Sequence, residues 1–426
     1  MKRAARWTLV VMLGLTALAA VTIGAFMRLV PSDQELASRI SAAAKESLGV
    51  TVTVRSAHLQ LWPQPELVLA DVATVQDQPV SLRLLVAHPD WAELLRRRLS
   101  LRDVEIDGAV IPQLSLLDLH VKPAAIDGSM PVPMQQLHFQ HLTWITRYGK
   151  ELEFEGNAFF DPDGLPRQAE LVRSGVQPAP RLTLARQGPD HWRVEMQLGG
   201  GTANGQVELA RDKNGRMQLS GKLAPHDIEV ASALDSFKAH SPVSGKASGQ
   251  TLISGSGDTI GELAGSLHTR TNFKMAQATL LHVDVNKAIH SLGKDHAGQT
   301  ALRSLTGQMD TQNTHQGMVI RFTGIQAQGE SFTAKGEATV AKRHVDGEMT
   351  VDLAGGLVGV PVKVSGPLGR EHISVAMSAV AGEAAGAAVG TAILPGIGTV
   401  LGAGVGRAVG KLFGNESPQP DGKAAH

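Results

Sequence analysis

Sixteen histidines and forty acidic residues are the side chains in this sequence that could bind a metal ion or transfer a proton. The histidines are scattered, and no His-Glu-x-x-His motif occurs. His138 and His141 are three residues apart in an expected strand, so they are predicted to point to opposite faces. Asp161 and Asp163 lie in an expected turn, where carboxylates commonly bind backbone amides. We therefore expect no metal site and no acid–base pair.

Two glycine patterns resemble nucleotide-binding motifs, and both depart from them. The segment from Gly404 to Lys411 is one residue longer than a phosphate-binding loop, and Leu412 stands where Ser or Thr is required. Gly255, Gly257 and Gly261 miss the spacing of a dinucleotide site. No Gly-x-Ser-x-Gly nucleophile motif is present. The sequence therefore predicts neither a cofactor nor an enzymatic activity.

The composition excludes a disulfide-stabilised fold and argues against a nucleic-acid partner. The chain has no cysteine, so it can form neither disulfides nor thiolate metal sites. Forty Lys and Arg residues balance forty Asp and Glu residues, and aromatic residues make up only 4% of the chain. A basic surface with stacking rings is therefore not expected. Forty-six glycines indicate a turn-rich chain, and we expect a mainly β fold.

The N-terminal region predicts a membrane anchor. Residues Trp7–Met27 are uncharged and follow Lys2, Arg3 and Arg6. About 20 apolar residues span a bilayer, and the basic flank is expected to stay in the cytoplasm. The alternative is a signal peptide that is cleaved near Ala17–Ala19, and both readings export the rest of the chain. The residues expected to contact the bilayer are Leu9, Val10, Leu13, Leu15, Leu18, Ile23 and Phe26.

Near the C-terminus, glycines recur at every fourth position on either side of a helix-breaking segment, Ile393–Gly396. This spacing places the glycines on one face of a helix, where a second helix can approach closely. We expect a membrane-associating helical hairpin, with a flexible Ala/Gly tail or a soluble helix pair as alternatives. Residues from Glu416 are predicted to be disordered. The helix-packing glycines are Gly382, Gly386, Gly390, Gly398, Gly402, Gly406 and Gly410.

Between these two ends, apolar and polar residues alternate with a period of two. The alternation is clearest over residues 50–55, 82–86, 151–155, 192–198, 345–353, 360–364 and 373–377. Such alternation is typical of antiparallel strands with one apolar and one solvated face. Three helices are also predicted, over residues 33–48, 90–97 and 284–292, the first of them opened by a capping box from Ser32 to Glu35.

The apolar face of such a sheet must be covered, since its burial is worth roughly 25 cal/mol per Å². Either a second protein layer covers it, or the sheet curls into a trough that holds acyl chains. An exported sheet with a membrane anchor favours the trough. The residues expected to line it are Val52, Val54, Leu82, Leu84, Val104, Ile106, Val194, Met196, Val351, Leu353, Val362, Val364 and Val375.

Residues 1–111 resemble the N-terminal region of the AsmA-like family of periplasmic bridge-like lipid-transfer proteins. The resemblance is carried by the anchor, by Leu48-Gly49-Val50, and by the segments Leu59–Pro63, Glu66–Val72, Asp90–Leu95, Leu99–Leu101 and Val104–Ile111. Residues 273–377 resemble the C-terminal region of the family, and the residues between match only in pattern. A glycine-zipper hairpin departs from the amphipathic helix that is more usual at the end of these proteins.

The resemblance implies a protein of the Gram-negative inner membrane, with a single-pass anchor and its bulk in the periplasm. It further implies a long curled antiparallel β-groove that carries phospholipid toward the outer membrane. The expected partners are phospholipid, the inner membrane, an inner-membrane protein and, through the hairpin, the outer membrane. Two alternatives remain: an assembly factor for outer-membrane proteins that carries no lipid, and a membrane-active hairpin on an exported stalk.

The expected organisation has six parts. They are a cytoplasmic N-terminus with the anchor (1–30), a helix plus strands (31–120), a middle β-groove (121–272), a C-terminal β-meander (273–378), the Gly/Ala-rich hairpin (379–415) and a tail (416–426).

Overall fold

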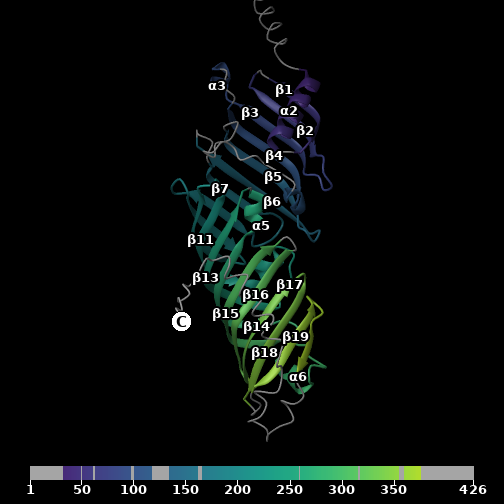
Figure 1. The fold of residues 1–426 in the computed structure, drawn as a ribbon, viewed down its shortest axis with the longest axis vertical. Coiled ribbons are helices and arrows are strands. Elements are labelled where there is room, and N and C mark those ends of the chain that lie inside the picture. The colour runs from purple at the N-terminus through teal and green to yellow at the C-terminus, as the bar shows by residue number, and fades with distance from the viewer. Residues whose placement is uncertain are drawn as a thin grey trace, which may run out of the picture. The chain divides into compact units, whose positions relative to one another are not determined.

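The computed structural model describes residues 32–48, 50–60, 63–96, 100–117, 134–161, 166–258, 260–314, 317–354 and 359–375. The predicted anchor, the hairpin and the tail lie outside these residues. Every strand of the described part belongs to one 20-stranded sheet, which is long, open and curled (Figure 1). The expectation of a mainly β fold with a few short helices is therefore confirmed.

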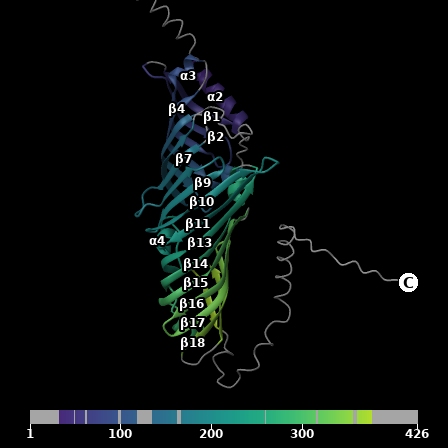
Figure 2. The ribbon, with the colours of Figure 1, turned by 90° about the vertical axis from the view of Figure 1, so that its left-hand side faces the viewer.

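Consecutive strands pair with one another along the sheet (Figure 2), except that β11 and β12 both pair with β13. Their bounds are β1 Val52–Gln60, β2 Glu66–Thr74, β3 Ser81–Pro89, β4 Leu101–Pro112, β5 Met134–Ile145, β6 Glu151–Phe160, β7 Pro166–Arg173, β8 Arg181–Arg186, β9 His191–Leu198, β10 Gly201–Arg211, β11 Met217–His226, β12 Ile228–Glu229, β13 Val243–Gly257, β14 His268–Leu280, β15 Thr300–Thr314, β16 Gly317–Gly329, β17 Phe332–Ala341, β18 His344–Leu353, β19 Val360–Pro367 and β20 His372–Val375.

Nearly all neighbouring strands pair antiparallel, as the alternation predicts. The exception is the parallel pair β4–β5, in which Val104 lies opposite Leu137. A parallel step needs a crossover, and the connection here is the longest between two consecutive strands of the described chain. The expected domain boundary at residues 272–273 falls inside β14, so the sheet continues across it.

The helices are short apart from the first, and they lie at the ends of strands. Their bounds are α2 Asp33–Leu48, α3 Trp91–Leu95, the 3₁₀ helix η1 Gln113–Leu117, α4 Val230–Asp235, α5 Ile260–Gly265 and α6 Val285–His290. The three predicted helices correspond to α2, α3 and α6. Two further ones, α4 and α5, are six residues each and too short to show a helical period. No described helix is both long enough and apolar enough to cross a bilayer.

A row of left-handed residues interrupts the pleat across the N-terminal strands. Asp71 in β2, Gly108 in β4 and His141 in β5 all have positive φ, between 51° and 70°. Gly108 lies against Arg83 of β3, since a Cβ added there would be 2.9 Å from the Cβ of Arg83. A left-handed residue inside a strand breaks the two-residue alternation of side chains, as a bulge does. The face on which a side chain lies therefore changes phase at this row.

Candidate apolar ligand-binding face

One face of the sheet carries mainly apolar side chains from β1 to β20, and we call it the apolar face; the opposite face is the polar face. A group of threonines, Thr251, Thr269, Thr271 and Thr311, interrupts the apolar face on β13–β15. Residues directly opposite one another on paired strands share a face. Val351 lies opposite Val360 on one side and Ala334 on the other, and the pairing can be followed strand by strand through the sheet. The apolar face can thus be followed through the described strands, and most of its side chains are apolar.

Most of the large side chains on the apolar face are neither fully buried nor freely exposed. Leu137, Phe154, Leu182, Met196 and Leu223 all have intermediate exposure. All described strands belong to this one sheet, so no second sheet within the described residues covers the face. Part of the apolar surface of these side chains is therefore still exposed.

The cross-strand partners place twelve of the thirteen residues that were predicted to line a trough on the apolar face. In the C-terminal strands, Val351, Leu353, Val362, Val364 and Val375 form one connected group. Val194 and Met196 lie opposite Leu184 and Leu182 of β8. Near the N-terminus, the residues of this set are Val52, Val54, Leu82, Val104 and Ile106.

The structure places Leu84 differently from that prediction. It lies opposite Ala70 and Asp107, whereas its neighbour Leu85 lies opposite Ile106. Adjacent residues of a strand point to opposite faces, so Leu84 lies on the polar face with Asp107. Simple alternation placed Leu82 and Leu84 together, and the interrupted pleat at the left-handed row separates them.

Glycines on the apolar face make room for aromatic rings. A Cβ added at Gly156 would lie 2.6 Å from Cζ of Phe139 on the neighbouring strand, and 2.2 Å from a backbone oxygen. Gly307 of β15 lies beneath Phe273 of β14 in the same way. The ring of Phe273 meets that of Phe322 of β16 edge-on, with centroids 6.4 Å apart. The sheet thus covers part of its own face with a single layer of rings.

The C-terminal end of the apolar face is more tightly packed. Ile289 of α6 is 1% exposed and Val360 of β19 is fully buried. Gly293, just after α6, approaches the backbone of Ile373 in β20 so closely that an added Cβ would lie 2.2 Å from its carbonyl oxygen. Because α6 connects β14 to β15, the sheet must curl to bring β20 against it. This end therefore holds a small protein core.

Turns that connect strands far apart in the sequence also contact one another. The turn between β5 and β6 contains Arg147 and Tyr148, and both lie against Gly317 at the start of β16. The guanidinium of Arg343, in the turn between β17 and β18, lies 5.8 Å from the Tyr148 ring centroid. In addition, α5 contacts η1. These contacts join the N-terminal strands to β13–β18 across the curl, and we call the Arg147–Tyr148 turn with its partners the strap.

Arg173 is a buried cation on the apolar face. Only 5% of it is exposed, and its guanidinium lies 5.6 Å from the ring centroid of Phe154. Its Nη1 donates to the carbonyl oxygens of Glu153, at 2.7 Å, and Ser174. Its Nε is buried with no hydrogen-bond partner. Burial lowers the pKa of Arg173, an effect that Glu153 opposes. These contacts assign Arg173 to holding the β6–β7 end of the sheet together.

The polar face carries ion pairs along the interrupted row. Asp107 accepts from His141 Nδ1 at 2.8 Å and also from Arg83. The His141 hydrogen bond is the largest cause that lowers the pKa of Asp107. His138 lies opposite Glu105, so it shares this face with His141, contrary to the sequence prediction. The left-handed conformation of His141 breaks the alternation on which that prediction depended. No group of three or more metal-ligating side chains occurs among the described residues.

Comparisons of the chain with protein-family models, with curated proteins and with solved structures find no match.

Proposed function

We propose that this protein carries phospholipids along its apolar face, from the inner membrane of a Gram-negative envelope toward the outer membrane. Acyl chains would lie against the apolar side chains while headgroups remain in water, and no covalent bond would be made or broken. The observation that carries the proposal is a mainly apolar face that runs through the 20-stranded sheet, with many of its large side chains only partly buried. Twenty strands spaced by about 4.8 Å measure about 90 Å along the sheet.

If such a face were exposed to water, the protein would not gain the free energy that burial of its apolar area provides. Acyl chains supply the missing cover without a second protein layer. Side chains such as Leu182 and Met196 offer no hydrogen bonds and suit a ligand that slides. The resemblance to the AsmA-like family adds the expected direction and compartment, with the N-terminal apolar run as the inner-membrane anchor and the glycine-rich segment as the distal contact.

The proposal is tested by the phospholipid that copurifies with the full chain, compared between two variants. Val362→Asp puts a charge on the half-exposed part of the apolar face, and Thr350→Asp puts the same charge on the polar face of the adjacent strand. Lipid extraction and mass spectrometry should show less bound phospholipid for Val362→Asp, with Thr350→Asp equal to wild type. Equal lipid content in all three proteins, each with an unchanged strand signal by circular dichroism, would contradict lipid carriage and favour the assembly-factor alternative.

A further inference from the structure

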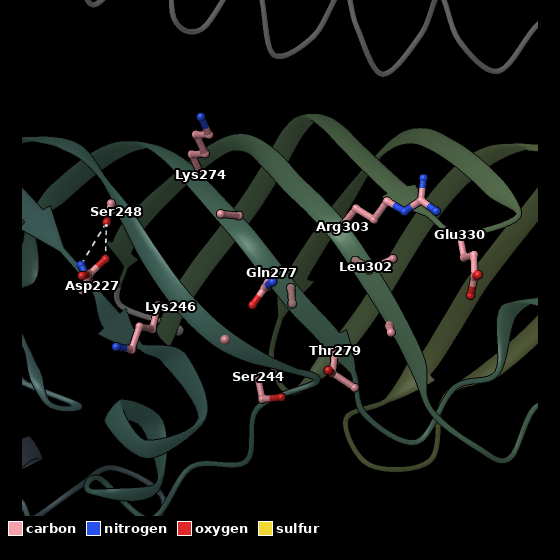
Figure 3. A pocket seen from close by; sticks show the side chains of 14 residues that line it. Asp227, Ser244, Lys246, Ser248, Lys274, Gln277, Thr279, Leu302, Arg303 and Glu330 are labelled. Atoms are coloured by element: carbon pink, nitrogen blue, oxygen red, sulfur yellow. Dashed lines mark hydrogen bonds between the residues drawn. The ribbon is translucent and has the colours of Figure 1, made fainter.

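A hollow of about 1080 Å³ lies on the polar face over β13, β14 and β15, away from the apolar face (Figure 3). Three cations line it, one from each strand: Lys246, Lys274 and Arg303. Figure 3 shows Gln277 and Thr279 lying between Lys246 and Arg303, so polar groups also line its middle. The hollow therefore collects positive charge and hydrogen-bonding groups from three neighbouring strands.

Irregularities in adjacent strands form this hollow. Two residues separate Met275 from Ala278 in β14, whereas one separates their partners, Ala247 and Gly245, in β13. Likewise, β15 carries one residue more than β16 between Leu302 and Leu305. An extra residue bends a strand and redirects its side chains, and such bulges are common beside binding sites. The bulged residues Ala276, Gln277 and Arg303 line the hollow.

None of the three cations has an ion-pair or hydrogen-bond partner among the described residues. The many ion pairs elsewhere on the polar face, such as Arg270 with Asp310 at 3.2 Å, show that this surface pairs charges where it can. Two carboxylates also line the hollow. Asp227 is already engaged with Ser248 and His226, and Glu330 lies at its edge beside Arg303 without forming an ion pair (Figure 3).

We propose that this hollow binds a phosphate-bearing anion, held by Lys246, Lys274 and Arg303 with Gln277 and Thr279 as additional donors. Ammonium and guanidinium groups are the side chains that bind phosphate oxygens most strongly, through charge-assisted hydrogen bonds. The anion is either a free phosphate compound or the headgroup of an anionic lipid, since both present the same oxygens. The site stands on the polar face, so it does not depend on lipid carriage by the apolar face.

The test uses the full chain in detergent and isothermal titration calorimetry with inorganic phosphate and with glycerol 1-phosphate, the latter standing for a lipid headgroup. Wild type should bind at least one of them saturably, and the affinity should fall as salt is raised. The triple variant Lys246→Gln, Lys274→Gln, Arg303→Gln should bind about tenfold or more weakly. Tighter binding of glycerol 1-phosphate assigns the site to headgroups, and equal or tighter binding of inorganic phosphate assigns it to free phosphate compounds.

A matched control carries the same change in charge outside the hollow. Lys222, Arg321 and Lys335 are exposed on other strands, and their triple glutamine variant should bind as wild type does. The variant Lys246→Arg, Lys274→Arg keeps the charge and should retain binding. Strand content by circular dichroism shows that each variant is folded. The proposal is overturned if wild type binds neither compound, or if the hollow variant and the control variant bind equally.

Discussion

The guanidinium of Arg343 lies 5.8 Å from the centre of the ring of Tyr148, although the two residues belong to turns on opposite halves of the sheet. Tyr148 is the single tyrosine of the chain and is half-exposed. Its turn also lies against Gly317, where an added Cβ would be 3.2 Å from the Tyr148 hydroxyl. The strap therefore joins the β5–β6 turn to β16 and to the β17–β18 turn across the curl of the sheet.

The strap predicts a specific cross-link. The chain has no cysteine, so Tyr148→Cys with Arg343→Cys creates one defined pair. A short bismaleimide should join the two thiols, and the product should migrate differently in denaturing gel electrophoresis. The pair Tyr148→Cys with Lys222→Cys, placed on another strand, should not react in this way. Absence of the first cross-link under conditions where each single cysteine is labelled would mean that the two turns do not meet.

Gly156 lies beneath the ring of Phe139, so a larger residue at position 156 is predicted to destabilise the fold. Gly156→Ala places a methyl group 2.2 Å from a backbone oxygen and 2.6 Å from the ring, so the strands must shift. Overpacking of this kind costs about 1–3 kcal/mol of unfolding free energy, measurable by urea denaturation. Gly265→Ala, where an added Cβ meets no atom within 4 Å, is the control and should change stability little. Equal stabilities would show that β5 and β6 pack less closely.

Two valines on the apolar face are expected to respond differently to the same charge. Val351 is 3% exposed, so Val351→Asp should lower the free energy of unfolding by about 3 kcal/mol or more, because the carboxylate is buried without a partner. Val362 on the next strand is half-exposed, and Val362→Asp should cost less. Urea denaturation of both variants measures the difference. A larger loss for Val362→Asp would contradict the packed C-terminal end.

Asp310 predicts a loss of stability in acid. Burial raises its pKa, but hydrogen bonds from His268 at 2.7 Å and Arg270 at 3.2 Å outweigh burial and hold the pKa below its ordinary value of 3.8. A lowered pKa stabilises the fold above pH 3.8, and this stabilisation is lost as the pH falls through the folded-state value.

Asp310→Asn should therefore lower the unfolding free energy by about 1.5–3 kcal/mol at neutral pH, and the difference from wild type should shrink below pH 3.8. Thermal unfolding followed by circular dichroism across this range provides the measurement. Asp346→Asn, at an exposed position of β18, serves as the control and should behave as wild type. A difference that persisted unchanged into strong acid would assign the effect to packing instead of charge.

Local sequence patterns predicted the sheet well where the pleat is regular. Val345–Leu353 alternates without interruption, and β18 spans this segment. Prediction failed at Leu84 and at His141, because left-handed residues in adjacent strands change the phase of the pleat, and this depends on pairing between strands. Within that row, Gly108 is the only residue whose type indicates a left-handed backbone conformation from the sequence alone. The strap and the hollow could not be predicted either, since each joins segments that only the curl or the strand register brings together.

Site-specific photo-crosslinking in living cells measures contact between lipid and the apolar face most directly. A photoreactive phenylalanine analogue replaces Met196 on the apolar face or, as the control, the adjacent Gln197 on the polar face. In cells whose phospholipids carry radioactive phosphate, we predict a labelled adduct after irradiation at position 196 and none at 197. No labelled adduct at 196, or equal labelling at both positions, would contradict the proposal that acyl chains occupy this face.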